Sequence, residues 1–135
     1  MQTKDPSMFL MTQPFPENLI LCITLETNRS HFKTPSHYKN YSQISKAPKP
    51  VMRAHDFLQV THKRKMVTIE PILDFDLEIF VDMLKALNPE IVYVGYDNHS
   101  CHLPEPRLEK GLQLIEELQK FTEVRLKTIR KAWYE

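Results

Sequence analysis

The sequence predicts an α/β fold whose parallel strands form a partial, roughly half, TIM-type barrel of about four βα units. Two observations indicate this class: short apolar runs rich in β-forming residues recur along the 135 residues, and segments with helical spacing separate them. Little polar alternation is typical of parallel strands buried on both faces. Alternating strands and helices imply right-handed βαβ units, as in half of a (β/α)₈ barrel or in a small open α/β sheet. We expect residues 1–135 to form one domain.

Four runs are predicted as strands because they combine apolar and β-branched residues over short lengths. The first has Asn18 before it and Asn28 after it, the second is closed by Glu70-Pro71, and the fourth alternates with polar residues. In chain order the predicted strands cover residues 19–25, 66–69, 91–95 and 124–129.

Helical patterns are predicted between these strands. The clearest covers residues 77–87, where apolar residues recur three and four positions apart, with Asp76 as its N-cap and Asn88-Pro89 as its end. In residues 51–60 the apolar positions are Val51, Ala54, Phe57 and Leu58. The remaining predicted helices cover residues 6–11 and 106–121.

Composition excludes several function classes. Cys22 and Cys101 cannot form a disulfide framework, a four-cysteine zinc site or a three-cysteine iron–sulfur site. Gly95 and Gly111 are too far apart for a P-loop or a dinucleotide fingerprint. No signal peptide or membrane-spanning run is visible, so we expect a cytoplasmic protein without membrane association.

Charge is segregated along the chain although the net charge is only +1. Residues 28–65 carry nine lysines and arginines and one acidic residue, whereas residues 66–118 carry eleven acidic residues and three basic ones. The basic stretch contains a long loop, residues 30–49, with interleaved tyrosines and histidines. Such a pattern is typical either of a solvated loop and helix surface or of weak binding to single-stranded nucleic acid.

Polar residues follow the predicted strands where parallel strands present their carboxyl ends, the edge at which such sheets bind ligands. Carboxylates, amides and an arginine on one rim could hold an amino-acid or ribose group. These residues are Glu26, Asn28 and Arg29 after the first strand, Glu70 after the second, Asp97, Asn98 and His99 after the third, and Lys127 near the end of the fourth. Solvated loop ends are the alternative interpretation.

Metal binding is not predicted. His99, Cys101 and His102 are close in sequence, but their spacing fits no standard zinc pattern and a fourth ligand would have to come from elsewhere.

Several segments together resemble the C-terminal half of radical S-adenosylmethionine-like proteins of the kind often carried by phages and mobile elements. They are PFPENLILCITLETNR at 14–29, ISKAP at 44–48, KMVTIEPILDFDL at 65–77, LNPEIVYVGYDN at 87–98 and LPEP at 103–106. The opening Gln2–Pro6 is similar to the end of the preceding barrel strand in that family. The most specific feature is the IEP turn followed by DFDL.

The resemblance implies that Glu26, Asn28, Arg29 and Glu70 are cofactor contacts, and that Asp97, Asn98, His99 and Lys127 are substrate contacts. The family's three-cysteine loop, which binds a 4Fe–4S cluster and through it S-adenosylmethionine, has no counterpart here. We therefore expect no cofactor on this chain alone, with both groups confined to full-length relatives.

The predicted function is that of a truncated or split radical-SAM-like protein, which supplies part of a binding rim and is not catalytic alone. A fragment or a decayed remnant would have the same sequence features. The alternative is a non-enzymatic module that uses residues 28–65 to bind nucleic acid or a phosphorylated ligand. Because a half-barrel leaves sheet edges and part of an apolar face uncovered, we expect a homodimer or a missing N-terminal half-barrel as partner.

Overall fold

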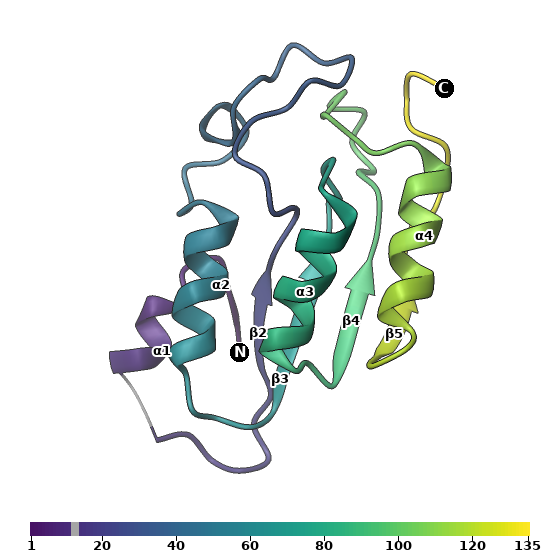
Figure 1. Ribbon diagram of the computed structural model, residues 1–135. Helices are drawn as coiled ribbons and strands as arrows, with labels where there is room; N and C mark the ends of the chain where they lie inside the picture. The colour runs from purple at the N-terminus through teal and green to yellow at the C-terminus, as the bar shows by residue number, and fades with distance from the viewer. Residues whose placement is uncertain (12–13) are drawn as a thin grey trace.

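A five-stranded parallel sheet with helices between its strands forms the protein, as the computed structural model of residues 1–11 and 14–135 describes it (Figure 1). The strands are β1 (Gln2–Thr3), β2 (Leu21–Thr24), β3 (Lys65–Ile69), β4 (Ile91–Val94) and β5 (Glu123–Leu126). The helices are α1 (Ser7–Met11), α2 (Pro50–Gln59), α3 (Leu77–Leu87) and α4 (Leu108–Leu118), with a short 3₁₀ helix η1 (Tyr41–Gln43). The predicted α/β class is confirmed.

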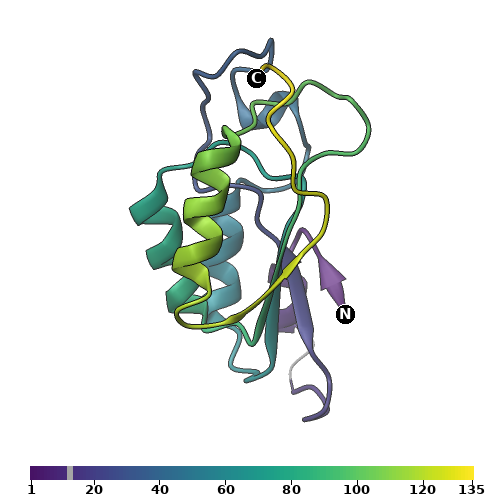
Figure 2. The same ribbon diagram turned by 90° about the vertical axis from the view of Figure 1, so that its right-hand side faces the viewer.

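Strand order in the sheet follows chain order, β1-β2-β3-β4-β5, and every neighbouring pair is parallel. Helices α2, α3 and α4 form one layer on the same side of the sheet (Figures 1 and 2). Helix α1 joins this layer, because Phe9 packs against Phe57 of α2. The sheet therefore has one face covered by helices and one face without them, which we call the helix-free face.

The hydrophobic core lies between the sheet and the helix layer. Ile23, Val67 and Val92 stand in register on three neighbouring strands, and all three are fully buried. Phe57, Phe80 and Leu114 reach them from α2, α3 and α4. Side chains alternate between the two faces along a strand. The residues directly before and after each of these core positions therefore point to the helix-free face.

The helix-free face carries an apolar row beside a polar one. Cys22, Met66 and Ile91 stand in register across β2 to β4, and Met66 and Ile91 are half-buried. Thr24, Thr68, Tyr93 and Arg125 stand in register across β2 to β5. The Nε2 of Gln2 donates hydrogen bonds to the hydroxyls of both threonines, at 3.4 and 3.2 Å. Burial on both faces is confirmed for β2, whereas the residues of β5 are mostly exposed at the sheet edge.

The predicted elements occur in the predicted order, and they are preceded by β1 at the position where the resemblance indicated the end of a strand. Gln2 and Thr3 pair in parallel with Cys22 and Ile23, which gives four βα units followed by β5. Element ends differ by a few residues: β2 is shorter than the predicted 19–25, and α4 is shorter than 106–121.

The buried face of α2 differs from the predicted one. Val51 and Leu58 are 53% and 48% exposed, whereas Pro50 and Arg53 are buried beside Phe57. The helix is rotated in this way because the guanidinium of Arg53 finds partners at the sheet edge, as described below.

Residues 30–49 connect β2 to α2, and this loop has structure of its own. A β-bridge joins His31 and Asn40, and η1 follows it directly. Phe32 and Tyr41 pack with Leu73 and Leu103 in a second hydrophobic cluster outside the main core. The loop is thereby fixed over the carboxyl edge of the sheet, where Figure 1 shows it above the strands.

Both ends of α3 lie where the sequence places them. Asp76 occupies the N-cap position, but its side chain does not cap the helix. Asn88 ends the helix in the left-handed conformation at φ 51°, the usual backbone for a C-terminal residue of this kind.

Candidate functional site

A cavity of about 320 Å³ opens at the carboxyl edge of the sheet, between the 30–49 loop and the loop that follows β4. Its walls combine charged or polar side chains with an apolar surface from both loops and from the turn after β3. The lining residues are Lys4, Glu26, Tyr38, Tyr41, Ile44, Ser45, Pro71, Leu73, Asp97, His99, Cys101 and Leu103. This is the edge at which parallel α/β sheets bind ligands.

Three of the predicted rim residues, Glu26, Asp97 and His99, come together at this cavity. They arrive from the ends of β2 and β4, which are separated by β3 in the sheet. Glu70 follows β3 between them but is not among the lining residues, and its neighbour Pro71 lines the cavity instead.

Glu26 is held by a buried network that the sequence did not reveal. Its Oε2 accepts hydrogen bonds from Arg53 Nη2 at 2.9 Å and from the Tyr41 hydroxyl at 2.5 Å. Lys4 Nζ lies 3.5 Å from Oε1 on the cavity side. Arg53 also donates to the carbonyls of Thr24 and Pro48, so nearly all its donors are used.

The negative charge of Glu26 is neutralised, because the cations of Lys4 and Arg53 lie beside its carboxylate. Burial and the neighbouring Glu26 carboxylate raise the pKa of the Tyr41 hydroxyl well above its ordinary value, so Tyr41 remains a neutral donor. A signal for Arg53 exists in the sequence: it stands three residues after Pro50 and four before Phe57, which is a core position of an amphipathic helix.

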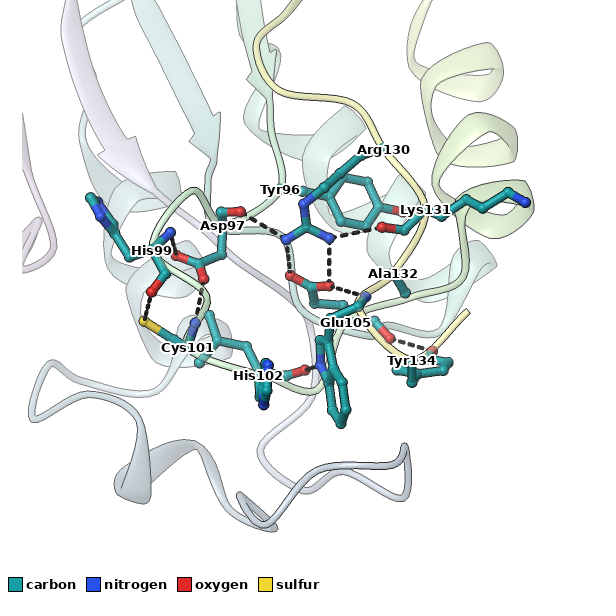
Figure 3. A network of polar contacts seen from close by, with 12 residues as sticks. Tyr96, Asp97, His99, Cys101, His102, Glu105, Arg130, Lys131, Ala132 and Tyr134 are labelled. Atoms are coloured by element: carbon teal, nitrogen blue, oxygen red, sulfur yellow. Dashed lines mark hydrogen bonds and ion pairs between the residues drawn. The ribbon is translucent and has the colours of Figure 1, made fainter.

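Asp97 organises the loop after β4 (Figure 3). Its two carboxylate oxygens accept hydrogen bonds from the backbone amides of His99, at 3.1 Å, and Cys101, at 2.8 Å. Burial opposes ionisation of Asp97, but these amides together outweigh it and hold the pKa of the carboxyl below its ordinary value. Asp97 therefore fixes the loop that carries His99 and Cys101 at the cavity.

Asn28 and Arg29 lie close to the rim but are engaged by the turn after β3. Arg29 donates to Asp74 and Asp76, each at 2.8 Å, and Lys110 of α4 binds the other oxygen of Asp74 at 2.7 Å. Asn28 accepts from the Asp76 amide at 2.8 Å. Neither residue lines the cavity, and their assignment as cofactor contacts stays a prediction.

Glu70 and Lys127 face each other on the helix-free face. Lys127 Nζ lies 3.1 Å from Glu70 Oε1, and the pair spans Gly95 of the intervening chain. The ammonium of Lys127 also lies 5.5 Å from the centre of the Tyr93 ring. The predicted cofactor contact Glu70 and the predicted substrate contact Lys127 are thus partners of each other and lie outside the cavity.

Asn98 lies on the other side of the loop after β4, in a second hollow of about 330 Å³ that includes Arg130 and Trp133. Arg130 binds both oxygens of Glu105, at 2.9 and 2.7 Å, and donates to the Asp97 carbonyl (Figure 3). The Trp133 ring stacks on His102 with centroids 4.5 Å apart. This arrangement ties the C-terminal residues to the rim.

A 4Fe–4S cluster does not fit the residues present. Such a cluster needs at least three cysteine thiolates, whereas Cys22 is buried in β2 and Cys101 lies on the loop after β4. Burial raises the pKa of the Cys22 thiol to about 11, and that of Cys101 is also raised. Within residues 1–11 and 14–135, no group of three or more histidine, cysteine, aspartate or glutamate side chains could hold a metal ion.

Some lysines and arginines of residues 28–65 bind other groups of the same protein. Four of the nine cations in this stretch, Arg29, Arg53, Arg64 and Lys65, bind carboxylates or carbonyls of the same chain. The other five are exposed: Lys33, Lys39, Lys46, Lys49 and Lys63.

Neither a family model, nor a curated protein, nor a solved structure matches the chain. Among the described residues, no helix combines the length and apolar character needed to span a membrane.

Proposed function

We propose that this chain is part of a barrel of the radical S-adenosylmethionine-like type, and that its carboxyl-edge cavity contributes to binding a cofactor or substrate without catalysing a reaction alone. The observation that carries the proposal is the strand order. In doubly wound sheets the order reverses and helices cover both faces, whereas a barrel has consecutive parallel strands with all helices outside. Consecutive order and a single helix layer favour the barrel type.

The polar row on the helix-free face supports the same proposal. Thr24, Thr68 and the Glu70–Lys127 pair would face the interior of a completed barrel, where polar groups near the carboxyl edge meet a ligand. The cavity offers a small molecule an apolar surface at Leu73 and Leu103 and polar groups at Lys4 and His99. This mixture is usual for small-molecule sites.

The partner in this proposal is a polypeptide that completes the barrel along β1 and β5. These two strands are the sheet edges, and each leaves one row of backbone groups without a neighbouring strand in the sheet. An adjacent upstream reading frame with three closely spaced cysteines would identify that partner. The proposal also places the protein in the cytoplasm.

Calorimetric titration of the full chain with S-adenosylmethionine tests the cavity. We expect no saturable binding by this chain alone and binding once the N-terminal half-barrel is supplied; that binding should be lost in the Lys4→Gln/His99→Ala variant and retained in Lys63→Gln, which changes an exposed lysine elsewhere. Saturable binding by the chain alone, or equal binding by the two variants in the completed barrel, would contradict the proposed rim.

Anaerobic incubation with iron and sulfide tests the second part of the proposal. We expect no stoichiometric cluster, because the chain has only two cysteines. A stable cluster with four irons per chain would overturn the proposal that this chain is inactive alone.

A further inference from the structure

Strand β5 ends the sheet on one side, and its outer edge faces no further strand of the described residues (Figure 2). The amide of Lys127 donates to the carbonyl of Val94 in β4. Because the backbone N–H and C=O groups of successive residues point to opposite sides of a strand, Arg125 also bonds toward β4. Val124 and Leu126 therefore direct their backbone groups to the open edge.

The side chains beside this edge form two rows. On the helix side, Val124 packs against the main core, whereas Leu126 is 53% exposed. On the helix-free face, Glu123 and Arg125 form an ion pair with 2.5 Å between Oε2 and Nε, and both side chains are about half exposed. The edge thus combines an exposed leucine with two opposite charges that lie two residues apart on one face of the strand.

The order of these charges is complementary to itself in one antiparallel register. If β5 of a second copy lies antiparallel, with the two-fold axis beside Val124, the two Val124 residues exchange their outward N–H and C=O groups. Glu123 of each copy then lies directly opposite Arg125 of the other, in the close type of cross-strand pair. The neighbouring symmetric registers, centred on Glu123 or on Arg125, would instead place two like charges opposite each other.

From this register we infer that β5 pairs with β5 of a second copy, so that the two sheets become continuous in a closed, two-fold symmetric dimer. A strand edge with unpaired backbone groups is a template for such pairing. The second copy's strand also brings its Val124 diagonally beside the exposed Leu126. Strand β1, the other edge, has only two residues and offers a shorter template.

This dimer goes beyond the proposed function and does not depend on it. A polypeptide that completes the barrel needs the same edge of β5, so that polypeptide and the second copy exclude each other. The dimer is the form expected of the chain by itself. The cavity is not part of the contact, because no residue of β5 lines it.

Sedimentation velocity of the full chain over a range of concentrations tests the dimer. We expect a dimer whose share increases with concentration through the micromolar range. A monomer at every concentration up to the millimolar range would overturn the inference.

Charge variants test the register. Arg125→Glu and Glu123→Arg should each weaken association by at least about tenfold, because like charges then face each other in both cross-strand pairs. An equimolar mixture of the two variants should associate again, and so should the double variant Glu123→Arg/Arg125→Glu, since both restore opposite charges at each pair. Failure of either to associate would overturn the inference.

A backbone variant tests the strand pairing itself. Val124→Pro removes an outward N–H that the sheet of one chain does not use, and edge strands accept proline at such positions. This variant should be monomeric, and circular dichroism should show that it is folded. The control Lys63→Glu changes net charge by the same amount as Arg125→Glu at an exposed site on another segment, and it should still dimerise. A folded Val124→Pro variant that dimerises, or a monomeric Lys63→Glu variant, would overturn the inference.

Discussion

The Glu26 carboxylate and the Arg53 guanidinium form an ion pair of 2.9 Å in which the two side chains are 3% and 0% exposed. The pair joins α2 to the end of β2 and, through Tyr41, also holds the 30–49 loop. Removing one partner of a buried pair leaves an uncompensated charge, which costs far more than losing a surface pair.

Arg53→Met should therefore lower the free energy of unfolding by about 3–5 kcal/mol, because Glu26 would remain buried without its main cation. Urea denaturation followed by circular dichroism measures this. Arg64→Met is the matched control: its partner Glu90 is exposed, so the loss of stability should be much smaller than for Arg53→Met. Equal losses in the two variants would contradict the role given to Arg53, and Glu26→Gln/Arg53→Met should recover part of the loss.

Gly95→Ala should reduce stability mainly by displacing Glu70. A Cβ at this position would lie 2.6 Å from Glu70 Oε2, the far end of a flexible side chain, and 3.0 Å from Lys127 Cβ. Because the carboxylate can move aside, Gly95→Ala should destabilise the fold by only about 1 kcal/mol. In a Glu70→Ala background the cost should fall by at least about 0.5 kcal/mol, since the carboxylate is gone. Strictly additive effects in a double-mutant cycle would refute the proposed contact.

Gly111→Ala in α4 should have opposite effects on stability in the presence and absence of the Tyr96 hydroxyl. Alanine normally favours a helix over glycine by about 1 kcal/mol, but here its Cβ would lie 2.6 Å from the Tyr96 hydroxyl. We expect Gly111→Ala to destabilise the wild-type protein and to stabilise the Tyr96→Phe variant, in which the nearest ring atoms are 3.5 Å away. Thermal unfolding of the four proteins gives the comparison, and stabilisation by Gly111→Ala in both backgrounds would count against it.

Stability should fall in acid partly because of Asp76. The hydrogen bond from Arg29 lowers the pKa of this carboxyl from 3.8 to about 2. A lowered pKa in the folded state means that the contribution is present above the ordinary pKa and is lost as the pH falls toward 2. Asp76 is 44% exposed, so solvent screening limits the contribution to about 1 kcal/mol or less.

Asp76→Asn should accordingly reduce the slope of unfolding free energy against pH between about 4 and 2. Asp82→Asn, at an exposed position on the same helix, is the matched control variant. An identical slope in wild type and Asp76→Asn would argue against the Arg29 contact.

Local pattern was sufficient to predict most of the fold. The β-rich runs and the helical spacing at 77–87 predict elements that the structure contains. This works because the residues buried by a helix or a strand recur at the period of that element, and this period can be seen in the sequence. Strand β1 shows no such pattern, because two residues are too few to reveal a period. Only the resemblance at Gln2–Pro6 indicated a strand there, and in the structure Gln2 and Thr3 pair with β2.

Long-range contacts decided the candidate site. The sequence alone established the polar residues after each strand, the two cysteines and the segregated charge. Only tertiary structure could bring Glu26, Asp97 and His99 to one cavity while pairing Arg29 with Asp74 and Lys127 with Glu70. The physical reason is that a charged side chain at a strand end is drawn to whichever opposite charge lies nearest after folding, and that partner is often tens of residues away in sequence.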